Sequence, residues 1–330
     1  MKDIVEKIIQ PFEDFISEET ELLPFAETGF TPIQIDKENF HELGIFSNSK
    51  DIIAVDGGNA EILSGAGFSV QFIRVVALTS PITLKEFFCF IRPKNIEGKI
   101  NYLVKIFGDN LFDKDIIIPS KFKTIDGQNF NLDISSVGDI IRRYSELILA
   151  EQSLQQDTYL IMDGSIKAKT ETELSYLKKL INKSKTNNTV IGFLSKTCSL
   201  LTKNGYSLST KLQELGPKSS WYYHPVFDIQ DNNYLGEMLF VRLSQKSYHV
   251  FRLELSSKKD DFILALSKNS KDPVFHGYPY CLIQADKLAR VSNKENDYLR
   301  TMFLAKIKNK SSLKYLLSTK DAHLILDNIS

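Results

Sequence analysis

Apolar residues along this chain recur with two periods, one typical of strands and one typical of helices. Residues 68–78 alternate between apolar and polar side chains and then become wholly apolar, as in a long strand that enters a core. Shorter apolar runs bounded by polar or turn-forming residues are typical of buried strands. The sequence therefore predicts further strands at 52–55, 87–91, 159–162 and 189–194.

Helical spacing of apolar residues predicts two helices among these strands. The first covers residues 136–154, with a buried side that includes Val137, Ile141 and Tyr144, and the second covers residues 171–183. Short connections between the early strands favour antiparallel pairing, whereas the later strand–helix–strand order favours a parallel arrangement. This order is the ribonuclease H-like topology. We therefore expect an α/β fold in which helices flank a mixed sheet, with insertions.

Two segments stand outside this pattern. Residues 1–50 begin with apolar residues at helical spacing, interrupted by Pro11, and continue as a polar, extended approach to the first strand. We expect this N-terminal segment to pack on a core domain of residues 51–330. Residues 93–135 are polar and irregular, so we expect an insertion with only one short strand, at 116–118. The apolar positions of the N-terminal helix are Ile4, Ile8, Ile9, Phe12, Phe15 and Ile16.

The C-terminal part of the chain adds a hairpin and several helices. Residues 204–236 are rich in loops and contain Trp221, Tyr222 and Tyr223, which we expect to lie in the core. Residues 238–243 and 248–255 predict a hairpin. From residue 258 onward helices predominate, and we expect one of them to include residues 285–292.

Charge and cysteine content narrow the class of protein. The 330 residues include 41 Lys and Arg and 41 Asp and Glu, so the formal net charge is zero. A surface that is basic throughout and binds nucleic acid over its whole extent is therefore not implied. The isolated Cys89, Cys198 and Cys281 disfavour a zinc site and fit a reducing compartment. The charged start is unlike a signal peptide, and no apolar run approaches the roughly 18 residues of a membrane span. We expect a cytoplasmic protein with no membrane association.

Two of the predicted buried strands are followed at once by an aspartate and a glycine. Asp56 follows residues 52–55 and precedes Gly57 and Gly58, and Asp163 follows residues 159–162. Because open α/β sheets place their ligands at the carboxyl ends of the strands, we expect both carboxylates at one edge of the sheet. We expect the glycines to let the chain turn sharply after Asp56 and to let a ligand approach the backbone.

A carboxylate pair of this kind points to metal chemistry. The two groups repel each other unless a cation lies between them. A pair of divalent ions about 4 Å apart suits phosphodiester hydrolysis, since one ion activates a water and the other stabilises the leaving oxygen. Oxygen-only ligands favour Mg²⁺ or Mn²⁺ over zinc. An aspartate before glycine can also merely shape a turn, but two of them in these topological places favour a function.

A further carboxylate is expected from the helix before Asp163. Glu146 and Glu151 lie five residues apart, so they do not share a face of a helix with 3.6 residues per turn. Glu146 lies beside the buried stripe of this helix, and we prefer it as the third ligand. The alternative is that Glu146 is a solvated surface residue.

Several sequence blocks, in a fixed order over residues 51 to about 300, resemble the NurA nucleases. They include the two strand–aspartate units and the Glu-bearing helix, whereas residues 1–50 and 93–135 carry no resemblance. The other blocks surround Lys196, Arg252 and Tyr278. In sequence letters the blocks are AVDGG (54–58), LIMDGS (160–165), IGFLSKT (191–197), VFRLE (250–254) and GYPYCLIQADKLA (277–289).

The resemblance implies a Mn²⁺-dependent DNA nuclease, with Mg²⁺ as the alternative metal. Such nucleases degrade DNA from 5′ ends, in some cases also cut single strands internally, and act with a hexameric HerA-type translocase in the resection of DNA breaks. The resemblance makes Asp56, Glu146 and Asp163 metal ligands. Because a neutral chain has little long-range attraction for DNA, we also expect a homodimer that relies on the translocase.

Three further site residues follow from the resemblance alone. Asp286 falls where the family often has histidine, and because a carboxylate also binds manganese we keep it as a fourth metal ligand and catalytic residue. The alternative is an ion pair between Asp286 and Arg290, one helical turn away. Lys196 and Tyr278 fall on family motif positions and are candidate contacts to phosphate or base.

Two other functions compete with a nuclease. An actin-like or sugar-kinase-like ATPase shares this core topology, and Asp56-Gly57-Gly58-Asn59 resembles its first phosphate loop, but the last hundred residues offer only Gly277 for its later glycine motifs. A non-catalytic DNA-processing partner subunit would use Asp56 and Asp163 only to shape turns. Manganese-dependent stabilisation distinguishes the nuclease from such a partner.

Overall fold

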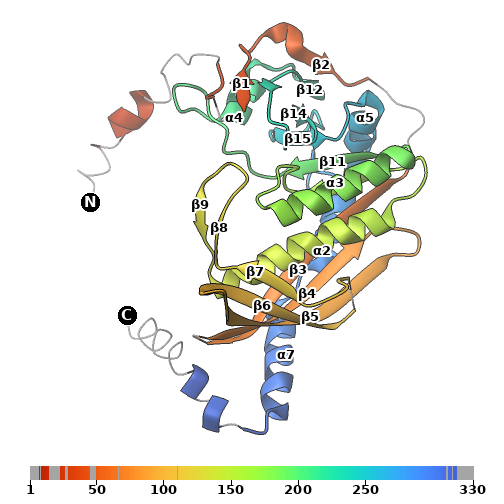
Figure 1. Cartoon of the computed structure of the whole chain (residues 1–330). Coiled ribbons are helices and arrows are strands. Elements are labelled where there is room, and N and C mark those ends of the chain that lie inside the picture. The colour runs from red at the N-terminus through yellow and green to blue at the C-terminus, as the bar shows by residue number, and fades with distance from the viewer. Residues whose placement is uncertain are drawn as a thin grey trace.

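The protein forms a mixed sheet with helices on both faces, as the computed structural model shows (Figure 1). The structure describes residues 7, 9–14, 23–26, 29–44, 50–65, 67–109, 111–309, 311–313 and 315–317. None of the helices in these ranges has the length and apolar character needed to cross a membrane. The expected α/β fold is confirmed.

The described sheet has 11 strands, and the predicted core strands lie at its centre. Parallel pairing joins β3 to β10 and β10 to β11, while the other neighbours pair antiparallel. In spatial order the strands are β2 (Phe40–Glu42), β12 (Trp221–Tyr223), β14 (Glu237–Arg242), β15 (Phe251–Leu255), β11 (Val190–Ser195), β10 (Tyr159–Asp163), β3 (Ile52–Gly65), β4 (Phe68–Ala77), β5 (Thr83–Ile96), β6 (Lys99–Gly108) and β7 (Ile116–Pro119).

Helices cover the sheet on both sides because its central strands are apolar on both faces. In β3, Ile53 and Val55 pack into the core cluster formed with α2 and α3, whereas Ala54 packs into the cluster formed with α5 and α6. Figure 1 shows α2 and α3 lying side by side over one face. The helices are α2 (Val137–Ser153), α3 (Glu171–Thr186), α4 (Leu208–Leu215), α5 (Asp260–Asn269), α6 (Tyr280–Ala289) and α7 (Asn293–Lys306).

The predicted helices at 136–154 and 171–183 are confirmed as α2 and α3, and the predicted hairpin as β14 and β15. Trp221, Tyr222 and Tyr223 are buried in β12, as expected for core residues. The region around them is more regular than expected, since it also contains α4 and β13 (Phe227–Ile229), which pairs with β1 (Phe30–Pro32).

The expectation of an irregular insertion at 93–135 is wrong. Strand β5 continues to Ile96, and β6 and β7 extend the sheet. A separate hairpin follows, formed by β8 (Lys121–Lys123) and β9 (Asn129–Asn131). The strand signal was weak because only one face of β6 is uniformly apolar, whereas on the other face Leu103 and Phe107 interrupt the alternation with polar residues. Burial does not follow polarity either, since Ile100 and Phe107 are exposed while Val104 is buried.

The ends of the chain also depart from expectation. Residues 7 and 9–14 are helical without a break at Pro11, and Ile9 and Phe12 are exposed rather than packed on the core. Ile4, Ile8, Phe15 and Ile16 lie outside the described residues. Strand β2, preceded by the 3₁₀ turn η1 (Lys37–Asn39), joins the edge of the sheet.

Residues 285–292 do not form one helix, because α6 ends at Ala289. Arg290 is extended there, and Ser292 caps the start of α7 by accepting a hydrogen bond from the backbone N–H of Glu295. Before α2, the 3₁₀ turn η2 (Ile134–Ser136) leads into the helix.

Candidate active site

The two predicted aspartates lie where the central strands separate. The pairing of β3 with β10 ends at Val55 and Met162, and Asp56 and Asp163 are the next residues on each strand. β10 ends there, but β3 continues to Gly65, paired with β4, so Asp56 lies inside a strand rather than at its end. The expected sharp turn after Asp56 is therefore wrong, while the expected convergence of the two carboxylates is found.

Gly57 and Gly58 serve close packing instead of a turn. A Cβ atom at Gly58 would clash with the carbonyl oxygen of Ala289, at the end of α6. A Cβ atom at Gly57 would lie 2.8 Å from Glu146 Oε1, on the other side of the sheet. These two glycines thus let α6 and the side chain of Glu146 approach β3 from opposite faces.

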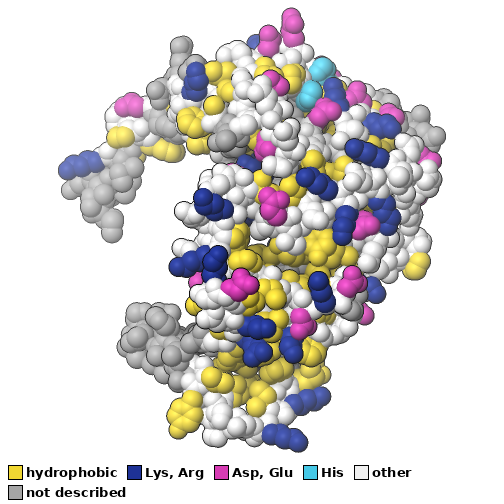
Figure 2. Space-filling model, viewed as in Figure 1, with side chains coloured by type: hydrophobic (Ala, Val, Ile, Leu, Met, Phe, Trp, Pro, Cys, Tyr) yellow, Lys and Arg dark blue, Asp and Glu magenta, His cyan; other side chains and the backbone are white. Residues whose placement is uncertain are grey.

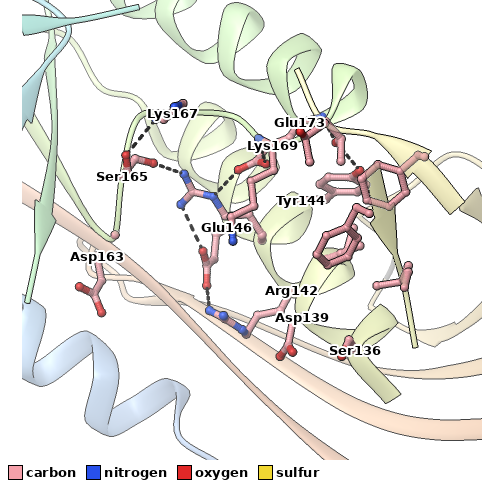
Figure 3. Close-up of a pocket in the computed structure, with 18 of the residues that line it drawn as sticks. Ser136, Asp139, Arg142, Tyr144, Glu146, Asp163, Ser165, Lys167, Lys169 and Glu173 are labelled. Carbon is pink, nitrogen blue, oxygen red and sulfur yellow. Dashed lines mark hydrogen bonds and ion pairs between the residues drawn. The ribbon is translucent and has the colours of Figure 1, made fainter. Parts of the chain in front are cut away.

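Glu146 reaches Asp56 from α2. Its side chain is buried and forms ion pairs with Arg142, at 2.5 Å, and Arg143, at 3.6 Å (Figure 3). Glu151 instead lies 3.7 Å from Lys183. The preference for Glu146 over Glu151 thus agrees with the geometry, although its role as a metal ligand stays a prediction.

Lys196, Tyr278 and Asp286 meet on the α6 side of the sheet. Lys196 Nζ lies 2.9 Å from Asp163 Oδ2 and 3.8 Å from Asp286 Oδ1, and 5.5 Å from the centre of the Tyr278 ring. Asp286 also pairs with Arg290, at 2.6 Å, so the helical ion pair that was the alternative for this residue is present. The Tyr278 hydroxyl is buried and has no hydrogen-bond partner among the described residues.

Burial and neighbouring charges shift the pKa values of this cluster. Desolvation, followed by repulsion from Glu146 and Asp163, raises the pKa of Asp56 from 3.8 to about 7, against the lowering effect of the Gly57 N–H hydrogen bond. Burial, with the nearby Asp163 and Asp56, raises the pKa of Tyr278. Burial opposes protonation of Lys196, but its bond to Asp163 keeps the pKa above the usual value. At neutral pH the ionised carboxylates of this cluster therefore need positive charge nearby to offset their burial and mutual repulsion.

The donor set fits a hard divalent cation, but the side chains are arranged for ion pairs. Asp56, Asp163, Glu146 and Asp286 offer only oxygen atoms, which suits Mg²⁺ or Mn²⁺. Within the ranges that the structure describes, no three Asp, Glu, His or Cys side chains lie close enough to hold one ion as they stand. If these carboxylates hold an ion, Lys196 would have to leave Asp163 and Glu146 would have to turn from its arginines.

A cavity of about 560 Å³ extends from the carboxylates along α2. Arg142, Arg143, Lys167 and Lys169 line it, and none of the four was predicted from the sequence as a site residue. A signal for Arg142 was present, because arginine four residues before glutamate on a helix indicates an ion pair. Lys167 and Lys169 gave no such signal, since they belong to a loop between β10 and α3.

Comparison with solved structures gives a likeness in fold. The crystal structure of the NurA nuclease from Sulfolobus solfataricus matches 94% of this chain and 98% of that chain, with a TM-score of 0.55 and 14% sequence identity. The chain has the NurA fold. The expected resemblance is therefore confirmed at the level of fold, including the ribonuclease H-like mixed sheet.

Other comparisons add nothing to the NurA likeness. Human ENDOV matches 81% of this chain and 94% of that chain, with a TM-score of 0.33 and 10% identity. Ciona intestinalis Endonuclease V, in complex with a 24mer DNA, matches 73% of this chain and 84% of that chain, with a TM-score of 0.34 and 12% identity. Both likenesses are too slight to carry an argument. No protein-family model and no curated protein matches the sequence.

Proposed function

We propose that this protein is a metal-dependent DNA nuclease that hydrolyses phosphodiester bonds. The observation that carries the proposal is the convergence of Asp56, Glu146 and Asp163 at the point where β3 and β10 separate. The NurA fold and the basic side chains that line the cavity beside these carboxylates support it. Basic and acidic side chains are otherwise interspersed over the face seen in Figure 2. The cavity is therefore a better candidate for a nucleic-acid site than that surface.

Hydrolysis forms a bond between a water oxygen and phosphorus and breaks the bond to a sugar oxygen, which takes up a proton. Lys196 and the Tyr278 hydroxyl are donors suited to the phosphate oxygens, and both lie beside Asp163. Phosphate binding would satisfy the unpaired Tyr278 hydroxyl and draw Lys196 away from Asp163.

The metal that we propose is Mn²⁺, with Mg²⁺ as the alternative, held by Asp56, Glu146, Asp163 and Asp286. When bound, such an ion neutralises these carboxylates, polarises the phosphoryl group and lowers the pKa of water. The carboxylate oxygens, the raised pKa of Asp56 and the absence of sulfur and imidazole from this donor set support a hard cation.

We extend the proposal to the finer features implied by the NurA resemblance. The enzyme would act as a 5′-to-3′ exonuclease and as a single-strand endonuclease in DNA end resection. It would work as a homodimer with a HerA-type hexameric translocase.

The actin-like ATPase alternative receives no support. A first phosphate loop requires Gly57 and Gly58 to lie at a turn, whereas both glycines are paired within the β3–β4 ladder. Gly58 also packs closely against the carbonyl group of Ala289. The non-catalytic alternative remains to be tested by the same experiment as the nuclease.

That experiment is a degradation assay on linear and circular DNA with Mn²⁺, Mg²⁺ or chelator. We expect cleavage with Mn²⁺, loss of cleavage with chelator, and loss in Asp163→Asn and in Glu146→Gln. Glu151→Gln is the matched control, because Glu151 lies on the same helix as Glu146 but pairs with Lys183. A folded wild-type protein that cleaves no DNA with either metal would contradict the proposal.

A further inference from the structure

The cavity beside the carboxylates has a second wall, built by the β8–β9 hairpin. Phe122, Thr124, Phe130 and Leu132 of this hairpin and its flank line the cavity together with α2 and the loop after Asp163. Figure 1 shows the hairpin rising beside the start of α2. The hairpin belongs to the segment 93–135, in which the sequence shows no family resemblance.

The hairpin is tied across the cavity to the opposite loop. The backbone N–H of Ile125 donates a hydrogen bond to the carbonyl oxygen of Lys169, at 3.2 Å. Asp126 Oδ2 pairs with Lys167 Nζ, also at 3.2 Å. These two contacts join the tip of the hairpin to the loop across the cavity. A cavity of about 560 Å³ bounded in this way has room for part of one strand but not for a DNA duplex.

The lining combines the two kinds of group that bind a single nucleic-acid strand. Phe122 and Phe130 form a ring pair with centroids 5.2 Å apart, and the Phe130 side chain is 44% exposed, which leaves an aromatic surface available for contact. Lys169 is exposed, and Arg142 and Arg143 also line the cavity, where both form ion pairs with Glu146. Aromatic rings stack on bases, and cations bind the intervening phosphates.

We propose that this cavity is a subsite for single-stranded DNA, in which a base stacks on Phe122 and Phe130 and the strand continues past Lys169 and Arg143 to the carboxylates. The inference deepens the proposed nuclease function. It rests on that function for the statement that the bound strand leads toward the carboxylates. The volume of about 560 Å³ suits one or two nucleotides, because pockets for small ligands span roughly 300–1,000 Å³. Duplex substrates would have to be opened before they are cut.

The test measures binding without cleavage. Fluorescence anisotropy of a labelled short oligodeoxythymidylate is recorded in chelator, so that no hydrolysis contributes. We expect Phe122→Leu/Phe130→Leu to weaken binding by about tenfold, because leucine keeps the apolar bulk but loses the stacking face. Phe107→Leu is the matched control, since Phe107 is a 57% exposed phenylalanine on β6 that does not line the cavity.

The single substitution Phe130→Leu guards against a folding defect, because Phe130 is partly exposed and its loss costs little packing. Lys169→Gln should weaken binding and lower its salt dependence, whereas Lys105→Gln, on an exposed position of β6, should do neither. A double variant that binds the oligonucleotide within twofold of wild type would overturn the subsite. Equal affinity of the wild type for duplex and single strand would overturn its selectivity.

A second arm separates this inference from the nuclease proposal. Asp126→Asn removes the pair with Lys167, and we expect it to raise cleavage of duplex relative to single strand. If no metal supports cleavage but the phenylalanine variants still lose binding, the nuclease proposal fails and the subsite stands. If the wild type cleaves and the phenylalanine variants bind and cleave as it does, the subsite alone fails.

Discussion

Asp56 is a buried carboxyl group whose charge the folded protein disfavours. Its pKa rises from 3.8 to about 7 through burial and through repulsion from Glu146 and Asp163. Between these two values the folded state keeps a proton that the unfolded state releases. Stability is therefore greater at low pH in this window and falls as the pH rises toward 7, by an amount of the order of a few kcal/mol.

Asp56→Asn should remove this loss of stability. In chelator, we expect the variant to be more stable than wild type by roughly 1–4 kcal/mol at about pH 8, with little difference at about pH 4. Denaturant unfolding at the two pH values measures the change. Asp163→Asn is the control, because it breaks the ion pair with Lys196 and should bring no gain. Both variants should lose Mn²⁺-dependent cleavage. A variant Asp56→Asn with the wild-type pH profile would show that Asp56 is already neutralised by another group.

Asp286 lies between two cations, Lys196 and Arg290, which leaves its role open to a direct test. If it binds the metal, Asp286→Ala should raise the Mn²⁺ concentration needed for cleavage and lower the rate sharply, whereas Arg290→Ala should do neither. Asp286→His, which introduces the residue often found at this position in the NurA nucleases that the sequence resembles, should keep much of the activity. Titration of cleavage rate with Mn²⁺ decides. Wild-type behaviour of Asp286→Ala at every concentration would reduce this residue to the helical ion pair, worth about 0.3–0.5 kcal/mol.

Strand β3 and helix α6 depend on each other through Gly58. An alanine there would place its Cβ against the carbonyl oxygen of Ala289, a backbone atom that has no side-chain freedom to move away. Gly58→Ala should therefore destabilise the protein by about 1–3 kcal/mol and displace α6, with a loss of cleavage. Gly67→Ala is the control, because no heavy atom of the described chain lies within 4 Å of the added methyl group. Equal melting temperatures of the two variants would show that α6 shifts without cost.

The sequence predicted those elements whose buried residues form a simple pattern, either a helical stripe or a continuous apolar run. Helix α2 has a continuous apolar stripe, and β10 is apolar at four successive positions before Asp163, so both were located to within a residue or two. β3 was cut short at Val55 because Gly57 and Gly58 are typical of turns. Only the packing of Glu146 and Ala289 against them shows why these glycines occupy a strand.

Site residues could be predicted from the sequence only where they follow an apolar strand, lie beside a helical stripe or fall in a block that resembles the NurA nucleases. Asp56 and Asp163 were found from the ends of apolar runs, and Glu146 from its place beside a helical stripe. The pairing of Lys196 with Asp163 joins β10 to the loop after β11, and nothing in local sequence indicates it. Lys169 and Phe130 meet at one cavity only because the β8–β9 hairpin crosses to the loop before α3.

The molecule as a whole combines a net charge of zero with a confined cavity that both basic and acidic side chains line. Equal numbers of basic and acidic residues, 41 of each, give the chain little net charge with which to attract DNA over long distances, and Figure 2 shows the two signs interspersed over one face. Attraction is therefore limited to short range, within about 8–10 Å at ordinary salt. Under the proposed function, such a cavity would hold a strand that is delivered to it better than it would capture one from solution.

The isolated protein should accordingly be a weak nuclease on long duplex DNA. We expect it to degrade short single strands readily, but to require a second copy of the chain and an ATP-driven translocase to process long duplexes. Sedimentation gives the oligomeric state, and parallel assays with and without the translocase and ATP give the dependence. The Phe122→Leu/Phe130→Leu variant serves as a comparison, since it should lose activity in both assays if the translocase delivers its strand to the β8–β9 cavity. A monomer that degrades long duplex efficiently without ATP would contradict the expectation. Such a protein would have to open the duplex and hold it without a translocase and with little net charge to attract it.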